Sequence, residues 1–212
     1  MHFFAGIAVA AACGLAPWAA ARFQTRWIAI AAVPFLLIVV TASVGGIGIY
    51  PFSDVFLAAL GLLAGIVLGR VMPPRFGPFL VLLLAFSIVD IAQNIAFAGP
   101  STPSTSLPPD PHLIWLNVRF PIEGGHFNIG IADVILITAA AENLRRRSAT
   151  LTLSLLPGII GIGLGEALVS TLPPHPPIVV LAISASLALF LAAGYALTEL
   201  AVSQTAAKYP TS

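Results

Sequence analysis

The sequence predicts an all-α integral membrane protein, a polytopic bundle of about seven transmembrane helices. Hydrophobic residues make up 58% of the 212-residue chain and charged residues only 8%, whereas soluble domains carry about 25% charged residues. Apolar runs of about 20 residues, long enough to span a bilayer, recur between short polar or proline-rich stretches. We therefore expect residues 1–212 to form a single membrane domain.

Seven apolar runs are the expected spans. The first lacks the positively charged start of a signal peptide, because the first arginine is Arg22, so we expect it to be retained as a helix. The third and fifth runs are the shortest. The runs cover residues 2–20, 26–48, 54–72, 77–98, 129–145, 151–172 and 177–201.

Cationic residues are confined to alternate connections, the pattern that the positive-inside rule predicts for cytoplasmic loops. The connections at 49–53 and 172–177 contain no Lys or Arg, and the long connection 99–128 contains only Arg119. We therefore expect a multi-pass protein of the inner (plasma) membrane, with the N-terminus outside and the C-terminus in the cytoplasm. The cations on the expected cytoplasmic side are Arg22, Arg26, Arg70, Arg75, Arg145, Arg146, Arg147 and Lys208.

Few binding partners are indicated by composition. The net charge of +1, with no basic patch beyond the arginine triplet, gives no reason to expect nucleic acid. The single cysteine, Cys13, excludes an intramolecular disulfide and a cysteine-based metal site, and we expect no metal and no cofactor. The expected partners are membrane lipids and a membrane-anchored protein, either a substrate or a partner subunit.

Glycines at four-residue spacing predict close helix packing. Gly61, Gly65 and Gly69 form a doubled small-xxx-small pattern on one face of the third span, and Gly158, Gly161 and Gly165 lie similarly on the sixth. The connection 99–128 begins rich in proline and serine. It then alternates apolar and polar side chains from Leu113, which predicts a short strand or an interfacial segment with Trp115 near the headgroups.

Three carboxylates are expected in the outer half of the bilayer. Asp90 lies about 12 Å from the outer end of span four at residue 98, and Asp133 lies about 6 Å inside the start of span five at residue 129. Glu166 on span six reaches a similar depth. An ionisable side chain inside a membrane indicates a functional site or a satisfied structural contact. Toward the cytoplasmic side we expect interfacial anchors rather than partners: Arg70, Glu142 and Glu199.

Asp90 and Asp133 flank one external loop on consecutive antiparallel spans. Two carboxylates that are brought close in a low-dielectric site share one proton, because both cannot ionise easily. The ionised member can then accept a proton from water while the protonated member donates to a carbonyl. This is the chemistry of aspartyl peptide hydrolysis.

The stretch from Phe127-Asn128 to Ala132-Asp133, followed by an apolar span that ends in arginines, resembles the F-N-x-A-D signature of lipoprotein signal peptidases (signal peptidase II). The resemblance covers residues 86–147. It implies that Asp133 is the second catalytic aspartate, that Asp90 is the first, and that Asn128 supports Asp133. This chain reads FNIGIAD, two residues longer than the motif, and on one ideal helix two extra residues rotate Asp133 by about 200° relative to its place in the motif.

The sequence therefore predicts an intramembrane aspartyl peptidase that cleaves lipoprotein-type, membrane-anchored substrates near the outer leaflet. Two alternatives stay open. A proton- or cation-coupled transporter would use Asp90, Asp133 and Glu166 as a relay. A non-catalytic membrane subunit or scaffold would use the same residues for packing or partner binding. The residues expected to bind substrate or support the aspartates are Asn94, Trp115, His126, Asn128 and Glu166.

Overall fold

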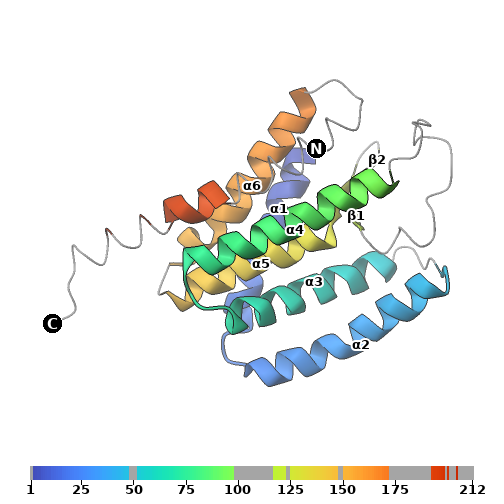
Figure 1. Ribbon diagram of the computed structural model, residues 1–212, viewed down its shortest axis with the longest axis horizontal. Coiled ribbons are helices and arrows are strands. Elements are labelled where there is room, and N and C mark those ends of the chain that lie inside the picture. Colours follow the sequence, from blue (N-terminus) through green and yellow to red (C-terminus); the bar gives the residue numbers. More distant parts are fainter. Residues whose placement is uncertain are drawn as a thin grey trace.

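A computed structural model describes residues 2–47, 52–97, 117–122, 125–147, 150–171, 192–198, 200 and 204. This part of the chain is mostly helical, as predicted (Figure 1). Residues 192–198 form a further helical segment. The elements are α1 (His2–Ala19), α2 (Thr25–Val44), α3 (Phe52–Val71), α4 (Phe76–Phe97), β1 (Asn117–Ile122), β2 (Gly125–Gly130), α5 (Ile131–Arg146) and α6 (Leu151–Thr171).

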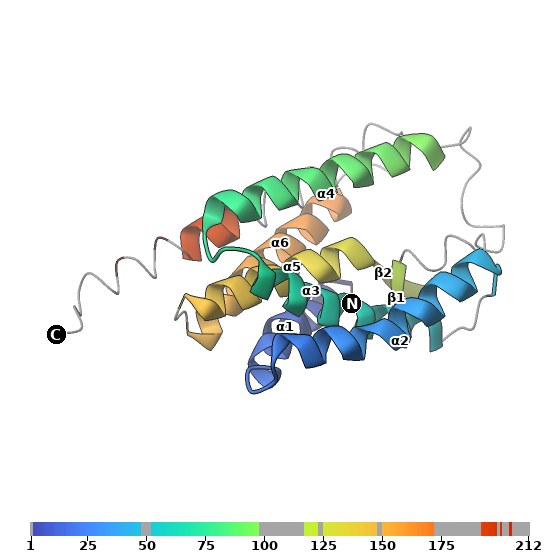
Figure 2. The same ribbon diagram turned by 60° about the horizontal axis from the view of Figure 1, so that its bottom comes forward.

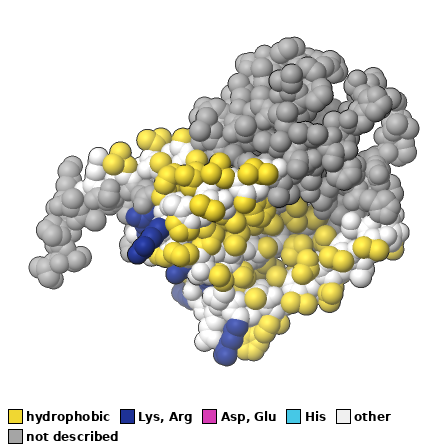
Figure 3. Space-filling view, viewed as in Figure 1, with side chains coloured by type: hydrophobic (Ala, Val, Ile, Leu, Met, Phe, Trp, Pro, Cys, Tyr) yellow, Lys and Arg dark blue, Asp and Glu magenta, His cyan; other side chains and the backbone are white. Residues whose placement is uncertain are grey.

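The six labelled helices alternate in direction. α1, α3 and α5 end at one end of the bundle, where α2, α4 and α6 begin (Figures 1 and 2). Seven arginines between Arg22 and Arg147 lie at this end, which we call the arginine end, either in the connections or in the adjoining first and last turns of helices. On the face drawn in Figure 3, the Lys and Arg side chains lie toward this end, and hydrophobic side chains cover the rest of the described surface. The hairpin formed by β1 and β2 lies at the opposite end, which we call the hairpin end.

Helices α3 and α5 form the centre of the bundle and run parallel. A Cβ on Gly61 would meet Val134, one on Gly65 would meet Thr138, and one on Gly69 would meet Glu142, at 2.6 to 2.8 Å. Each of these pairs is separated by 73 residues, so the two helices are in constant parallel register. The three glycines therefore let the helices approach closely, as their spacing predicts.

Of the outer helices, α2, α4 and α6 run antiparallel to this centre and α1 runs parallel to it. A Cβ on Gly14 of α1 would meet Leu155 of α6, and one on Gly158 would meet both Ala10 of α1 and Ile137 of α5. At the arginine end, Trp18 Nε1 donates a 3.1 Å hydrogen bond to Ser154 Oγ. α2 packs along α3, with the rings of Phe35 and Phe56 6.0 Å apart. These contacts enclose a core of apolar side chains around α5.

The two strands pair antiparallel, with Val118 opposite Ile129 and Asn117 opposite Gly130. Val118 and Ile129 are both buried, and β1 packs against α3. The structure thus confirms a strand in the second half of the 99–128 connection. It also shows a second strand, β2, that was not predicted. Because β2 continues to Gly130, α5 begins at Ile131 and not at residue 129.

Two described helices, α2 and α3, are 20 residues long and apolar enough to cross a membrane, which favours membrane association. Only 17% of the apolar window of α2 is buried, and its exposed side chains include Ile30, Leu36 and Leu37. An exposed apolar face of this size is typical of a surface that contacts a membrane or another protein. The first six predicted spans coincide with α1 to α6 within two residues at either end, except that the second, predicted to reach residue 48, ends four residues earlier at Val44. Most of the seventh, 177–201, lies outside the described residues.

Candidate functional site

Asp133 is the sequence-predicted residue that the structure describes best. It lies in the first turn of α5, three residues after Gly130, which precedes the helix in extended backbone conformation (φ −63°, ψ 141°). Its side chain is half-buried, and Oδ2 lies 2.9 Å from where a Cβ on Gly130 would stand. The carboxylate therefore bends back over the helix start, where a negative charge is favoured by the helix dipole.

The residues that the resemblance connects to Asp133 come from two different elements. Phe127 and Asn128 lie on β2, and Asp133 lies on α5. The helical rotation that separates FNIGIAD from the motif does not apply here, because the chain leaves the strand only at Gly130. His126 also lies on β2, opposite Pro121 in the hairpin. The side chains of His126 and Asn128 lie outside those that the structure describes.

The other predicted site residues are placed by backbone alone. Asp90 and Asn94 lie in the second half of α4, and Glu166 lies in the second half of α6. Both helices run toward the hairpin end, so these residues and Asp133 belong to the same half of the bundle. Their side chains are outside the described part, so contact between Asp90 and Asp133 stays a prediction. Trp115 and Glu199 lie outside the described residues altogether.

A further acid at the hairpin end, Asp54, was not singled out from the sequence. It lies in the first turn of α3 and is only 5% exposed, next to Ser53, which is wholly buried. The parallel register with α5 puts Asp54 about 9 Å nearer the hairpin end than Asp133. An Asp following a Ser at the start of an apolar helix is the signal that could have identified it.

The most completely described polar cluster lies at the arginine end. Glu142 of α5 is wholly buried, and its Oε1 accepts a 2.8 Å hydrogen bond from Arg70 Nε of α3. Arg145 donates to the same carboxylate from Nε, at 2.7 Å to Oε2, and from Nη2, at 2.9 Å to Oε1. One buried carboxylate therefore binds two guanidinium groups, one from each of two parallel helices.

The remaining donors of these arginines satisfy the ends of neighbouring helices. Arg70 donates to the carbonyl oxygens of Phe23 at 2.6 Å and Ala20 at 2.8 Å, just beyond α1. Arg146 Nη1 lies 2.7 to 3.0 Å from the carbonyl oxygens of Gly69, Arg70 and Met72, at the end of α3. Cations at a helix C-terminus stabilise its unpaired carbonyl groups and its dipole. The cluster therefore binds the ends of α1, α3 and α5 together.

A second buried contact extends the cluster to the C-terminal part of the chain. Asn143 Nδ2 donates to the carbonyl oxygen of Pro73 at 3.1 Å, and the Tyr195 hydroxyl donates to Asn143 Oδ1. The Tyr195 ring stacks on Phe79 of α4 with centroids 4.6 Å apart and on Phe76 at 5.5 Å. Buried polar groups that are paired in this way fix a single arrangement of helices.

This cluster corrects one sequence-based expectation. Arg70 and Glu142 were expected to be interfacial anchors and not partners, yet they form a direct ion pair in which the Glu142 side chain is 0% exposed. The sequence does show part of the signal, since Glu142 and Arg145 have the three-residue spacing of a helical ion pair. The role of Arg70 depends on the parallel packing of α3 on α5, which no local pattern reveals.

The two ends of the bundle differ in the chemistry that they allow. At the arginine end, the carboxylate of Glu142 is saturated by arginine donors and has no exposed surface for a substrate. At the hairpin end, the Asp133 side chain is only half-buried, so part of it stays exposed. Among the described residues, no group of three or more His, Cys, Asp or Glu side chains could hold a metal ion.

Comparisons with protein-family models, with curated proteins and with solved structures find no match to this chain.

Proposed function

We propose that this protein is an intramembrane aspartyl peptidase that cleaves membrane-anchored, lipoprotein-type substrates near the outer leaflet. The observation that carries the proposal is the path of the chain from Phe127-Asn128 on β2 to Asp133 in the first turn of α5. The resemblance to signal peptidase II implies an external strand followed by a span that opens with F-N-x-A-D. Here a strand is followed by a helix in the same order, with F-N on the strand and the aspartate in the first turn of the helix. Asp133 is half-buried at that junction, as an acid that activates water requires.

The proposed mechanism uses Asp90 and Asp133 as a pair that shares one proton. The ionised carboxylate accepts a proton from a water molecule, and the resulting hydroxide attacks the scissile carbonyl carbon. The protonated carboxylate donates a hydrogen bond to the carbonyl oxygen and stabilises the charge that develops there. When the tetrahedral intermediate collapses, the C–N bond breaks, and the carboxyl group that took the proton from water gives it to the leaving nitrogen. His126, Asn128 and Glu166 lie in the same half of the bundle by their backbone positions, and we assign them supporting roles.

The proposal includes a multi-pass arrangement in the inner membrane, with the N-terminus outside. Support comes from the alternating directions of α1 to α6 and from the gathering of seven arginines at one end of the bundle. If that end lies in the cytoplasm, as the positive-inside rule requires, Asp133 lies in the outer half of the bilayer.

A non-catalytic scaffold is the second candidate, and one observation favours it. Asp133 bends back over Gly130 at the start of α5, so its charge has a structural use at the helix N-terminus. A first-turn acid of this kind stabilises a helix by about 0.3–1 kcal/mol. The two candidates therefore predict different losses when the Asp133 charge is removed. The peptidase loses cleavage, and the scaffold loses helix stability.

Cleavage of a defined substrate tests the proposal. Purified protein in nanodiscs is incubated with a lipobox-containing prolipoprotein and with other single-span proteins, and products are identified by mass spectrometry. The wild-type protein should cleave, and Asp133→Asn should eliminate cleavage while lowering the free energy of unfolding by less than about 1 kcal/mol.

Asp54→Asn is the matched control, because Asp54 occupies the same first-turn position on the parallel neighbour α3. This variant should retain cleavage. No cleavage by wild-type protein across the panel favours the scaffold. Loss of cleavage in a stable Asp54→Asn variant would contradict the assignment of Asp90 and Asp133 as the pair.

A further inference from the structure

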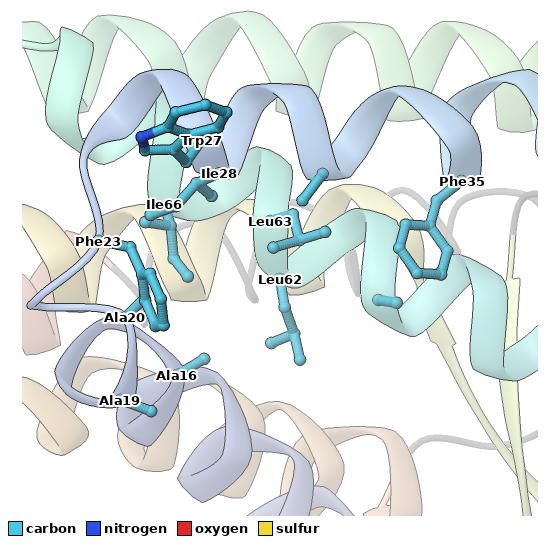
Figure 4. Close-up of a pocket in the computed structure, with 12 residues that line it drawn as sticks. Ala16, Ala19, Ala20, Phe23, Trp27, Ile28, Phe35, Leu62, Leu63 and Ile66 are labelled. Carbon is cyan, nitrogen blue, oxygen red and sulfur yellow. The ribbon is translucent and has the colours of Figure 1, made fainter.

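An apolar pocket of about 630 Å³ lies between the C-terminal end of α1, the first half of α2 and the facing side of α3 (Figure 4). The indole N–H of Trp27 is the one hydrogen-bonding side-chain group among the lining residues. The other lining side chains are alanines and large apolar groups, which include Phe23, Phe35, Leu62, Leu63 and Ile66. Such a lining accepts hydrocarbon and offers no partner to a polar ligand.

The pocket is elongated along α2. Figure 4 shows Phe23 and Trp27 toward one end, Phe35 toward the other, and Leu62 and Leu63 between them. Trp27 and Phe35 are eight residues apart on α2, which corresponds to about 12 Å along the helix axis. The long dimension therefore runs from the arginine end toward the hairpin end.

Two exposed cations stand at the arginine end of the pocket. Arg22 directly precedes Phe23, and Arg26 directly precedes Trp27. The Arg26 guanidinium lies 5.3 Å from the centroid of the Trp27 ring. In the part of the chain that the structure describes, Glu142 forms ion pairs with Arg70 and Arg145, and neither Arg22 nor Arg26 belongs to these pairs. Both are therefore placed to bind an anion at the mouth of an apolar pocket.

We propose that this pocket binds an acyl chain of a phospholipid whose anionic headgroup pairs with Arg22 and Arg26. The exposed apolar face of α2 places the pocket in contact with lipid, and Trp27 combines an apolar ring with one polar group, as residues at the headgroup level do. A lipid with a negative headgroup matches both the lining and the charges.

Quenching of Trp27 fluorescence by brominated lipids tests this site. The chain has three tryptophans, so a Trp18→Phe/Trp115→Phe variant leaves Trp27 as the single reporter. The variant is reconstituted in phosphatidylcholine vesicles that contain increasing fractions of acyl-brominated phosphatidylglycerol or acyl-brominated phosphatidylcholine. Brominated phosphatidylglycerol should quench Trp27 fluorescence saturably. Half-maximal quenching should occur at a mole fraction at least about tenfold lower than that needed for brominated phosphatidylcholine.

Matched variants distinguish lipid binding in the pocket from contact with bulk lipid. Arg22→Gln/Arg26→Gln should abolish the preference, with roughly a fivefold loss per arginine. Arg75→Gln removes an exposed arginine from another connection at the same end and should leave the preference unchanged. Ala31→Leu/Ala59→Leu fills the pocket and should remove the saturable component.

Native mass spectrometry of the wild-type protein provides a measurement that needs no tryptophan substitution. Protein released from mixed-lipid nanodiscs should retain phosphatidylglycerol in preference to phosphatidylcholine, and the Arg22→Gln/Arg26→Gln variant should lose that preference. Equal retention of the two lipids by wild-type protein, or an unchanged preference in the double arginine variant, would overturn the proposal. Equal quenching by the two brominated lipids would do so as well.

Discussion

The Nε atom of Arg70 lies 2.8 Å from Oε1 of the wholly buried Glu142 and joins two parallel helices whose contacting residues are 72 positions apart in the sequence. The pair lies at the arginine end of the glycine-lined interface between α3 and α5. It therefore fixes the axial register of α3 against α5. The position of Asp133, nine residues before Glu142 on α5, depends on the same register.

Removing one partner of this buried pair should destabilise the protein. Glu142→Gln leaves Arg70 without its carboxylate, and loss of one member of a buried pair costs roughly 3–5 kcal/mol. Equilibrium unfolding in detergent micelles should show a loss in that range. The exposed Arg75→Gln variant should unfold as the wild type does. A Glu142→Gln variant as stable as Arg75→Gln would show that the pair contributes nothing to the fold.

Gly65 should not tolerate a side chain. A Cβ there would lie 2.6 Å from Thr138 Cβ and 2.7 Å from the Ile135 carbonyl oxygen, and the carbonyl cannot move without shifting α5. Gly65→Ala should therefore cost about 1–3 kcal/mol. Gly77→Ala is the control, because no atom lies within 4 Å of its Cβ position, and it should be neutral or stabilising by up to about 1 kcal/mol. Thermal unfolding of both variants tests whether α3 and α5 approach this closely at Gly65. Equal stability of the two variants would contradict the close approach.

Tyr195 and Asn143 should be energetically coupled. Tyr195→Phe keeps the ring that stacks on Phe79 and removes the hydroxyl that donates to Asn143 Oδ1, which costs about 1–3 kcal/mol for a buried acceptor. In a double-mutant cycle with Asn143→Leu, the interaction free energy should be at least 0.5 kcal/mol. Strict additivity of the two substitutions would indicate that the hydroxyl does not bind Asn143 in the membrane.

The connections at the two ends of α2 should be accessible from opposite sides of the membrane. In a Cys13→Ala background, Gln24→Cys and Arg75→Cys at the arginine end should react with an impermeant thiol reagent only in inside-out vesicles. Ile47→Cys, after the other end of α2, should react only in right-side-out vesicles. Reaction of Gln24→Cys and Ile47→Cys from the same side would exclude α2 as a membrane span.

The helices were predictable because each is a long apolar run bounded by arginine, proline or glycine. α1 to α6 follow the predicted spans closely, from His2–Ala19 to Leu151–Thr171. Gly61, Gly65 and Gly69 also predicted a close contact on α3. They could not identify α5 as the neighbour, because small residues specify a distance of approach and not a partner.

The candidate site was predictable only in part. Asp133 was identified because a charge inside an apolar run is conspicuous, whereas Asp54 at the start of its run was not. The segment Gly125–Gly130 is too short to distinguish a strand from the start of a helix by its apolar pattern, and its pairing with Asn117–Ile122 settles the matter. The Arg70–Glu142 pair depends on tertiary packing. From the sequence alone, charged residues near the ends of spans are therefore predicted to be surface groups.

The most direct test of the proposed peptidase site is the proximity of Asp90 to Asp133. In the Cys13→Ala background, Asp90→Cys and Asp133→Cys are combined and treated with a short bifunctional thiosulfonate, and joined peptides are identified by mass spectrometry. The Val118→Cys/Ile129→Cys pair is the positive control, because these two residues lie directly opposite each other in the hairpin. Asp90→Cys with Gln24→Cys, at the arginine end, is the negative control. Our account predicts that the aspartate positions link as readily as the positive control. Linkage no greater than that of the negative control would contradict it.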